Sequence, residues 1–228
     1  AGTIITYAPG QTINVKILPG ERPSARGILF HPDYIHGTSL AGSISRFSFF
    51  SYAANEALYV CSDERQLFFD NLERIRLELN RPQDLLSRNI VCLNIELLLN
   101  YCSRFYARQF DTRKEPEHDV LVKFEKLLFE YFSSDRPLQI GLPTVKYFAD
   151  NVYLSPNYFG DMIKLQTGSS VRDIIHKAVI GTAKDRLLMN NDPINEIAYS
   201  MGFQTIQHFS SVFKKATGMS PLAFRKGK

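Results

Sequence analysis

The sequence predicts an α+β fold, in which part of an antiparallel β-barrel with helices precedes an all-α domain. Three observations predict this fold. Residues 1 to about 60 are short β-branched or aromatic runs separated by turns, and after them the apolar period becomes helical. Beyond residue 140, a unit of helix, tight turn and helix occurs twice. We therefore expect two domains, at 1–110 and 117–228.

The composition is that of a globular protein. Of the 228 residues, 44% are hydrophobic and 22% are charged, and no apolar run approaches the roughly 18 to 20 residues of a membrane span. The three cysteines lack metal-ligand spacing, which is typical of a reducing cytoplasm. The start, AGTIITYAPG, has no signal-peptide pattern and no initiator Met, so we expect a cytoplasmic chain that is a fragment of a longer protein.

Three runs near the N-terminus have the composition of strands: ITYAPG (5–10), TINVKIL (12–18) and RGILF (26–30). The separators between them, such as PGERP and HPDY, contain turn residues. The runs are short and have no helical period, so they predict an antiparallel sheet or part of a barrel. The run ISRFSFFSY (44–52) fits either another strand or an irregular segment.

A helical period follows. Phe68, Leu72, Ile75 and Leu79 form one apolar stripe, and a longer helix is predicted at 84–109 with Asp84 as its N-cap. Apolar residues occupy more than one face of this second helix: Leu86, Ile90, Leu93, Leu97, Tyr101 and Phe105 on one face, and Leu85, Val91, Ile95, Leu98 and Leu99 elsewhere. One face can pack on the sheet. The surplus predicts either a homodimer through the 84–109 helix or a helix buried inside its own domain.

The charged stretch FDTRKEPEHD (110–119) contains a proline and breaks the period, so it predicts a linker. After it, Val120, Phe124, Leu127 and Tyr131 predict a helix that ends at SSDRP.

The internal repeat joins LSPNYFGDMIKLQTGSS (154–170) to QTIQHFSSVFKKATGMS (204–220) at an offset of 50 residues. Seven positions correspond: Phe159 with Phe209, Met162 with Val212, Ile163 with Phe213, Lys164 with Lys214, Thr167 with Thr217, Gly168 with Gly218 and Ser170 with Ser220. A short helix and a turn precede each copy. The sequence therefore predicts two helix-turn-helix motifs, at about 144–168 and 194–218.

The capping residues agree with these boundaries. Ser155-Pro156 and Ser220-Pro221 are N-caps followed by proline at the first helical position, where its missing N–H costs no hydrogen bond. Gly168 and Gly218 end the second helix of each motif in the left-handed conformation. Gly202 lies in the second turn, where a positive φ is expected, and Tyr153 occupies the equivalent place in the first.

The second helix of the second motif is apolar behind and polar in front. Thr205, Gln207, His208 and Ser211 can hydrogen-bond base edges, and Lys214 and Lys215 can reach phosphates. Two such helices joined by a rigid helix can enter successive major grooves, about 34 Å apart. From residue 143 to 228 there are 11 Lys+Arg and 6 Asp+Glu, a balance of +5, whereas the rest of the chain has a balance of −1. We therefore predict binding to double-stranded DNA.

The stretch IAYSMGF-x5-FSSVFKKATGMSPLAFRK resembles the C-terminal signature of AraC/XylS-type bacterial transcription regulators, and LSPNYFGDMIKLQTG resembles their first helix-turn-helix. The resemblance covers about 142–226. It implies a seven-helix DNA-binding domain that follows a cupin-like barrel with dimerisation helices. It also implies a homodimer that binds promoter DNA. If the protein is an activator, RNA polymerase is a further partner. A small-molecule effector in the barrel is possible in this family, and the sequence identifies none.

Carried over from the family pattern, the base-facing positions of the second motif are Ile206, Gln207, His208 and Ser211, and those of the first are Asn157, Gly160 and Asp161. The complete predicted DNA-binding set is Ser155, Asn157, Tyr158, Asp161, Lys164, Thr205, Ile206, Gln207, His208, Ser211, Lys214 and Lys215. Gly160 and Asp161 depart from the most basic members of the family. Val179 stands where the family often has an arginine, which puts a phosphate contact there in doubt.

No catalytic or metal-binding motif is found. His31 and His36 are separated by four residues on a turn, without a carboxylate cluster, which is not a metal signature. Phosphate-binding, nucleophile-elbow and CxxC motifs are absent. The sequence thus predicts a DNA-binding regulator that is not an enzyme and has no cofactor. The alternative is a small-molecule-binding or enzymatic cupin whose helical half is a scaffold.

Overall fold

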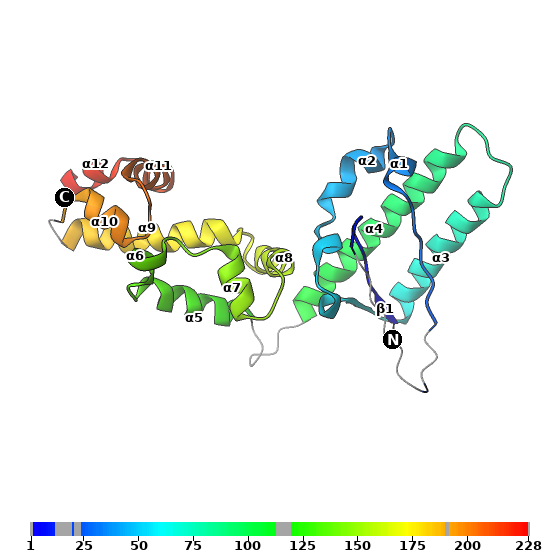
Figure 1. Ribbon diagram of the computed structural model, residues 1–228, viewed down its shortest axis with the longest axis horizontal. Coiled ribbons are helices and arrows are strands. Elements are labelled where there is room, and N and C mark those ends of the chain that lie inside the picture. Colours follow the sequence, from blue (N-terminus) through cyan, green and yellow to red (C-terminus); the bar gives the residue numbers. More distant parts are fainter. Residues whose placement is uncertain (1, 12–19, 21–23, 113–119, 190–191, 228) are drawn as a thin grey trace. The chain divides into compact units, whose positions relative to one another are not determined.

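The computed structural model describes residues 2–11, 20, 24–112, 120–189 and 192–227. The chain divides into two compact units, unit 1 (residues 1–112) and unit 2 (residues 113–228). It is mostly helical, and Figure 1 labels many of its elements, which in chain order are β1 (Gly2–Ile4), α1 (Pro32–Ile35), α2 (Ser39–Ser43), η1 (Ile44–Arg46), η2 (Ser48–Ser51), η3 (Ala54–Glu56), β2 (Leu58–Val60), α3 (Ser62–Leu79), α4 (Ser87–Thr112), α5 (Val120–Phe132), α6 (Arg136–Ile140), α7 (Val145–Asn151), α8 (Pro156–Thr167), α9 (Val171–Met189), α10 (Ile194–Ser200), α11 (Ile206–Thr217) and α12 (Pro221–Lys226). Among the described residues, every helix is too short or too polar to span a bilayer.

The sheet of unit 1 has two strands in the described ranges, β1 and β2, which pair antiparallel with Thr3 opposite Tyr59. These residues form no barrel. The strands predicted at 5–10 and 26–30 are wrong, and the open case, 44–52, forms mostly the 3₁₀ turns η1 and η2. The run 12–18 lies outside the described residues. A run with β propensity becomes a strand only where a neighbouring strand pairs with its backbone groups. In the run 26–30, the side chain of Leu29 is 99% exposed and has no packing partner.

Helix α4 forms the centre of unit 1, where it packs against α2, α3 and β2. The Asp84 carboxylate accepts hydrogen bonds from the amides of Leu86 and Ser87, at 2.8 and 2.9 Å, which confirms its predicted capping role. The face of α4 that packs inward is a set of buried apolar residues: Val91, Cys92, Ile95, Leu98, Leu99, Cys102, Phe105, Tyr106 and Phe110. Burial raises the pKa of the Cys102 thiol to about 12.

The other apolar stripe of α4 is exposed. Leu86 is 63% exposed, Leu93 is 49% exposed, and Ile90 and Leu97 are near 40%. Of the six residues predicted on this face, only Phe105 is buried. The sequence showed that α4 has more apolar surface than one face can bury, and the structure identifies which stripe is left over.

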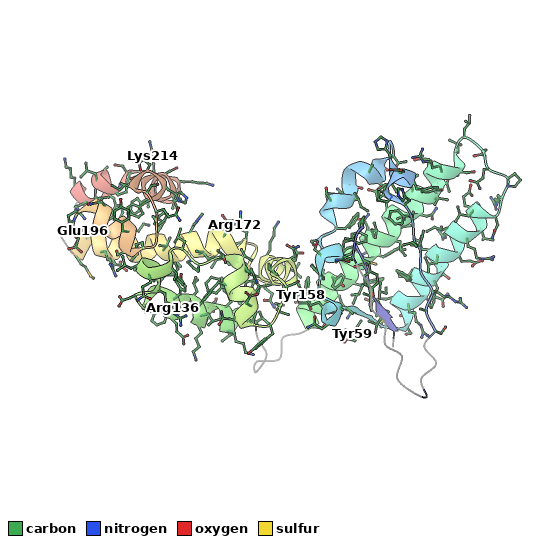
Figure 2. The ribbon with its side chains drawn as sticks, viewed as in Figure 1. Tyr59, Arg136, Tyr158, Arg172, Glu196 and Lys214 are labelled. Atoms are coloured by element: carbon green, nitrogen blue, oxygen red, sulfur yellow. The ribbon has the colours of Figure 1, made fainter. Side chains whose placement is uncertain are left out.

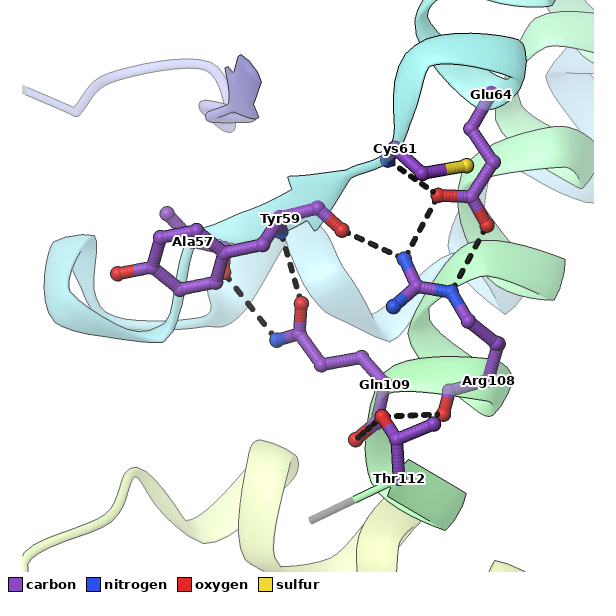
Figure 3. Close-up of polar contacts among 7 residues, drawn as sticks. All are labelled: Ala57, Tyr59, Cys61, Glu64, Arg108, Gln109 and Thr112. Carbon is purple, nitrogen blue, oxygen red and sulfur yellow. Dashed lines mark hydrogen bonds and ion pairs between the residues drawn. The ribbon is translucent and has the colours of Figure 1, made fainter. Parts of the chain in front are cut away.

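The last turns of α4 hold the edge of β2 that faces away from β1 (Figure 3). The Gln109 side chain is 3% exposed; its Oε1 accepts from the Tyr59 amide at 2.8 Å, and its Nε2 donates to the Ala57 carbonyl at 3.3 Å. Arg108 donates to the Tyr59 carbonyl and to both carboxylate oxygens of Glu64. Side chains thus supply the partners that a third strand would otherwise provide.

Glu64 joins this arrangement to α3. Burial pushes the pKa of its carboxyl upward, but hydrogen bonds from the Cys61 amide and from Arg108 outweigh burial and hold the pKa below its usual value. The carboxylate is therefore charged at neutral pH and ties the start of α3 to the end of α4.

Unit 2 contains two hydrophobic cores that share α9. The first core is made by α5, α7, α8 and the start of α9: Phe124, Leu128, Phe148, Ala149, Phe159, Ile163, Val171 and Ile175. The second is made by the rest of α9 with α10, α11 and the turn between them: Val179, Ile180, Ala183, Leu187, Ile197, Ala198, Met201, Phe203, Phe209 and Phe213. Val179 is fully buried here, so it has no route to a phosphate.

The Gln109 contacts lead to a test. Gln109→Leu keeps the volume but leaves the Tyr59 amide and the Ala57 carbonyl unpaired, so we expect a loss of about 2–4 kcal/mol in the free energy of unfolding of unit 1. Thr112→Val is the control, because its exposed hydroxyl bonds only carbonyls of its own helix, and it should cost less than about 0.5 kcal/mol. Urea unfolding of the full chain measures both. Equal losses for the two variants would contradict the role of Gln109.

Candidate nucleic-acid interface

The two predicted helix-turn-helix motifs are present as α7–α8 and α10–α11. Their turns close with the same backbone hydrogen bond: the Leu154 amide donates to the Ala149 carbonyl, and the Phe203 amide donates to the Ala198 carbonyl, both at 3.0 Å. In Figure 1, α9 runs between α8 and α11, which are both seen nearly end-on, so the axes of the two helices have similar directions. The repeat in the sequence is therefore a repeat in space.

Each turn contains one residue with a positive φ, at the equivalent position. It is Tyr153, at 58°, in the first turn and Gly202, at 89°, in the second. A Cβ on Gly202 would lie 2.6 Å from the carbonyl carbon of Gly141, so the second turn needs glycine both for its φ and for this close approach. Tyr153 lacks the freedom of glycine at positive φ, and its side chain is 88% exposed, so packing does not compensate for the strain.

The caps also repeat. Ser155 Oγ accepts from the Tyr158 amide, and Thr205 Oγ1 accepts from the His208 amide. At the other end, Gly168 and Gly218 have φ values of 72° and 79°, and each donates its amide to a lysine carbonyl four residues earlier at 2.8 Å. These contacts satisfy backbone groups that would otherwise be unpaired at the helix ends.

The backs of both helices are fixed in the cores. Phe159 and Ile163 in α8, and Phe209 and Phe213 in α11, are 0% exposed. The rings of Phe209 and Phe203 lie 5.2 Å apart in an edge-to-face contact. Complete burial of these four side chains determines which side of each helix faces solvent.

The solvent side of α11 is polar and basic. Gln207, His208, Ser211, Lys214 and Lys215, which we call the α11 face, are all exposed. The His208 ring packs edge-on against Phe203, with centroids 5.3 Å apart. Thr205 is exposed at the N-cap, and Ile206 is half-buried. The predicted residues of this motif are thus brought together on one accessible surface.

The solvent side of α8 is different. Asn157 and Lys164 are exposed, and Ser155, Gly160 and Asp161 are half-buried. Tyr158 is 0% exposed, so its prediction as a DNA contact is wrong. A tyrosine has an apolar ring and a polar tip, and helical spacing alone does not reveal which of them decides its orientation. Figure 2 labels Tyr158 on α8, Arg172 on α9 and Lys214 on α11.

One residue near the α11 face was not predicted, His176 in the first turns of α9; Arg172 lies one turn before it on the same helix. Partial burial lowers the pKa of His176, the charges of His208, Lys215 and Arg172 lower it further, and Asp173 acts in the opposite sense. The pKa of the Asp173 carboxyl is lowered first by a hydrogen bond from Ser170 and also by Lys215. The start of α9 is therefore electrostatically coupled to α11, although the two segments are more than 30 residues apart.

Unit 1 contains a partly open cavity of about 240 Å³. Aromatic rings form much of its wall: Tyr7, Phe49, Tyr52 and Tyr106. His31 and His36 are exposed, and His31 Nδ1 accepts from the Asp33 amide at the start of α1. In the residues that the structure describes, no group of three His, Cys, Asp or Glu side chains is placed to hold a metal ion.

Residues 148–227 match a family described as a helix-turn-helix domain. An uncharacterised helix-turn-helix transcriptional regulator of Bacillus subtilis, YobQ, is 32% identical over 82 residues, covering 36% of this chain and 34% of the relative. The arabinose operon regulatory protein of Escherichia coli is 38% identical over 131 residues, covering 58% of this chain and 44% of the relative. The aligned segments thus span less than half of these relatives.

Among solved structures, the C-terminal domain of the response regulator AraT from Geobacillus stearothermophilus is 30% identical, with a TM-score of 0.44, over 51% of this chain and 88% of that one.

Substitutions in the two turns should change the free energy of unfolding in opposite directions. Gly202→Ala places a methyl group against the Gly141 backbone at a positive φ, so we expect a loss of at least about 2 kcal/mol in the free energy of unfolding of unit 2. Tyr153→Gly relieves the backbone strain of a positive φ at an exposed site. The greater freedom of glycine in the unfolded chain partly offsets this gain in stability. Its unfolding free energy should be unchanged or higher by up to about 1 kcal/mol. Urea unfolding tests both, and a larger loss for Tyr153→Gly than for Gly202→Ala would refute the account.

Proposed function

We propose that this chain, in which residues 148–227 form a helix-turn-helix domain of the AraC type, is a sequence-specific transcription regulator that binds double-stranded promoter DNA. The observation that carries the proposal is the α11 face: five exposed polar or basic side chains on a helix whose back is completely buried. Such a helix can enter a major groove without losing its own packing, and Gln207 can pair with adenine through two hydrogen bonds. Its role is binding rather than catalysis.

The spacing of the two motifs supports insertion into successive major grooves. Helix α9, which joins them, runs from Val171 to Met189, and 19 residues at about 1.5 Å each make it about 28 Å long. One turn of DNA is about 34 Å. A rigid helix of this length can join two motifs that enter grooves on one side of a duplex.

We further propose that unit 1 is a cupin-like sensor and dimerisation domain that acts in the cytoplasm. The alignment with the arabinose operon regulatory protein is longer than the helix-turn-helix domain, which supports a regulatory unit beside it. The aromatic cavity is a candidate site for a small-molecule effector, because rings give an apolar ligand both area and orientation. RNA polymerase is the expected partner if the protein activates transcription.

The exposed stripe of α4 supports a homodimer. Leu86, Ile90, Leu93 and Leu97 recur at intervals of 4, 3 and 4 residues, so they lie along one line of the helix. A second copy of this stripe can cover them in an interface of helix against helix. Two chains would then present four recognition helices to one operator.

Substitutions in α11 test the DNA-binding role. Gln207→Ala should reduce affinity for a selected operator by about tenfold, because it removes a base contact, and affinity for scrambled DNA should change little. Lys214→Ala should weaken both duplexes alike and reduce the dependence of affinity on salt, because it removes a phosphate contact. Fluorescence anisotropy at several salt concentrations measures these effects. If Gln207→Ala lost as much affinity for scrambled DNA as for the operator, Gln207 would not be reading a base.

Leu93→Glu tests the dimer. A charge at the middle of the stripe would be buried without a partner, so we expect the dissociation constant of the dimer to rise by at least about 100-fold. Ser103→Glu is the control, because Ser103 is exposed on α4 but lies off the stripe. Sedimentation velocity of the full chain separates monomer from dimer. A Leu93→Glu chain that remains as dimeric as Ser103→Glu excludes this interface.

A further inference from the structure

We propose that the two recognition helices do unequal work: α11 reads the base sequence of its half-site, whereas α8 mainly holds the duplex in place and tolerates changes in its half-site. This inference rests on the proposed DNA-binding function. It concerns a difference between two motifs whose backbone contacts are the same, so its cause must lie in the side chains that face solvent.

The offset of 50 residues allows a comparison position by position. Asn157 corresponds to Gln207 and Lys164 to Lys214, and all four are exposed. The remaining three positions of the α11 face differ in α8: Tyr158 is buried where His208 is exposed, the carboxylate of Asp161 replaces the hydroxyl of Ser211, and Leu165, 50% exposed, replaces Lys215. Only two of the five positions of α8 therefore keep side chains suited to DNA.

The formal charge of α8 is also less favourable for DNA than that of α11. Lys214 and Lys215 give the α11 face a charge of +2, whereas Asp161 and Lys164 cancel on α8. A carboxylate that enters a groove is repelled by the phosphates on both sides, and the base edge best suited to it is the amino group of cytosine. Asp161 thus restricts what α8 can read to few base pairs and lowers its contribution to affinity.

The surroundings of α11 add no further positive charge that the structure shows. The start of α9 lies near the α11 face, because the charges of His208 and Lys215 lower the pKa of His176 after burial does, so His176 adds no positive charge at neutral pH. Asp173, in the same turn, carries a hydrogen bond from Ser170 and faces Lys215. The difference in charge between the two helices therefore comes from their own side chains, Lys214 and Lys215 on α11 and Asp161 and Lys164 on α8.

The experiment first selects an operator from a random duplex library with the full chain, and uses Gln207→Ala to identify the half-site that α11 reads. Each half-site is then scrambled separately. Scrambling the α11 half should reduce affinity by at least about 30-fold, and scrambling the α8 half by less than about threefold, since each lost base contact is worth roughly 5-fold or more. Half-sites that lose affinity equally would overturn the proposal.

Reciprocal variants test the cause. Asp161→Ser gives α8 the residue of α11, and we expect it to raise affinity about threefold at low salt, with a smaller gain at high salt. Ser211→Asp makes the opposite exchange and should reduce affinity by at least about tenfold. Thermal unfolding confirms that both variants are folded. A fall in affinity for Asp161→Ser would contradict the inference, whereas a chain that enriches no sequence from the library contradicts the proposed function itself.

Discussion

The burial of α9 in two cores at once is the constraint on which unit 2 depends. Its first turns place Val171 and Ile175 among the residues that hold α8, and its later turns place Val179, Ala183 and Leu187 among those that hold α11. A straight helix packed in this way does not allow the two motifs to move independently without opening a core. The separation of α8 and α11 is therefore set by their packing on α9.

A common scaffold can carry different chemistry because its contacts use backbone groups and buried rings. The turn hydrogen bonds, the N-caps and the left-handed glycines are the same in both motifs. None of them requires a particular side chain on the solvent side of the helix. The second turn is the more constrained of the two, since Gly202 lies against Gly141, whose carbonyl also accepts a hydrogen bond from Tyr131.

In unit 1, strand β2 pairs with another strand, β1, along only one of its edges. Gln109 and Arg108 take the place of a further strand, and the same helix presents its other apolar stripe to solvent. Any change in the position of β2 would thus act on the end of α4, next to the segment that leads to unit 2. This arrangement gives a physical path by which a ligand in unit 1 could affect the neighbouring helix.

The sequence by itself determined the longer helices, several of their caps and the repeat, since these depend on residues within a few positions of one another. Asp84, Ser155, Gly168 and Gly218 have the predicted roles for this reason. The burial of Phe159 and Phe209 likewise follows from helical spacing. The short helices α1, α2 and α6 were not predicted, and α1 lies in a segment that was interpreted as a turn.

Only the tertiary structure decided which strand-like runs pair, which way Tyr158 points and which stripe of α4 is left exposed. It also brought His176 of α9 close to α11, and Gly202 to Gly141. Each of these outcomes depends on a partner far away in the chain, and local periodicity carries no information about that partner.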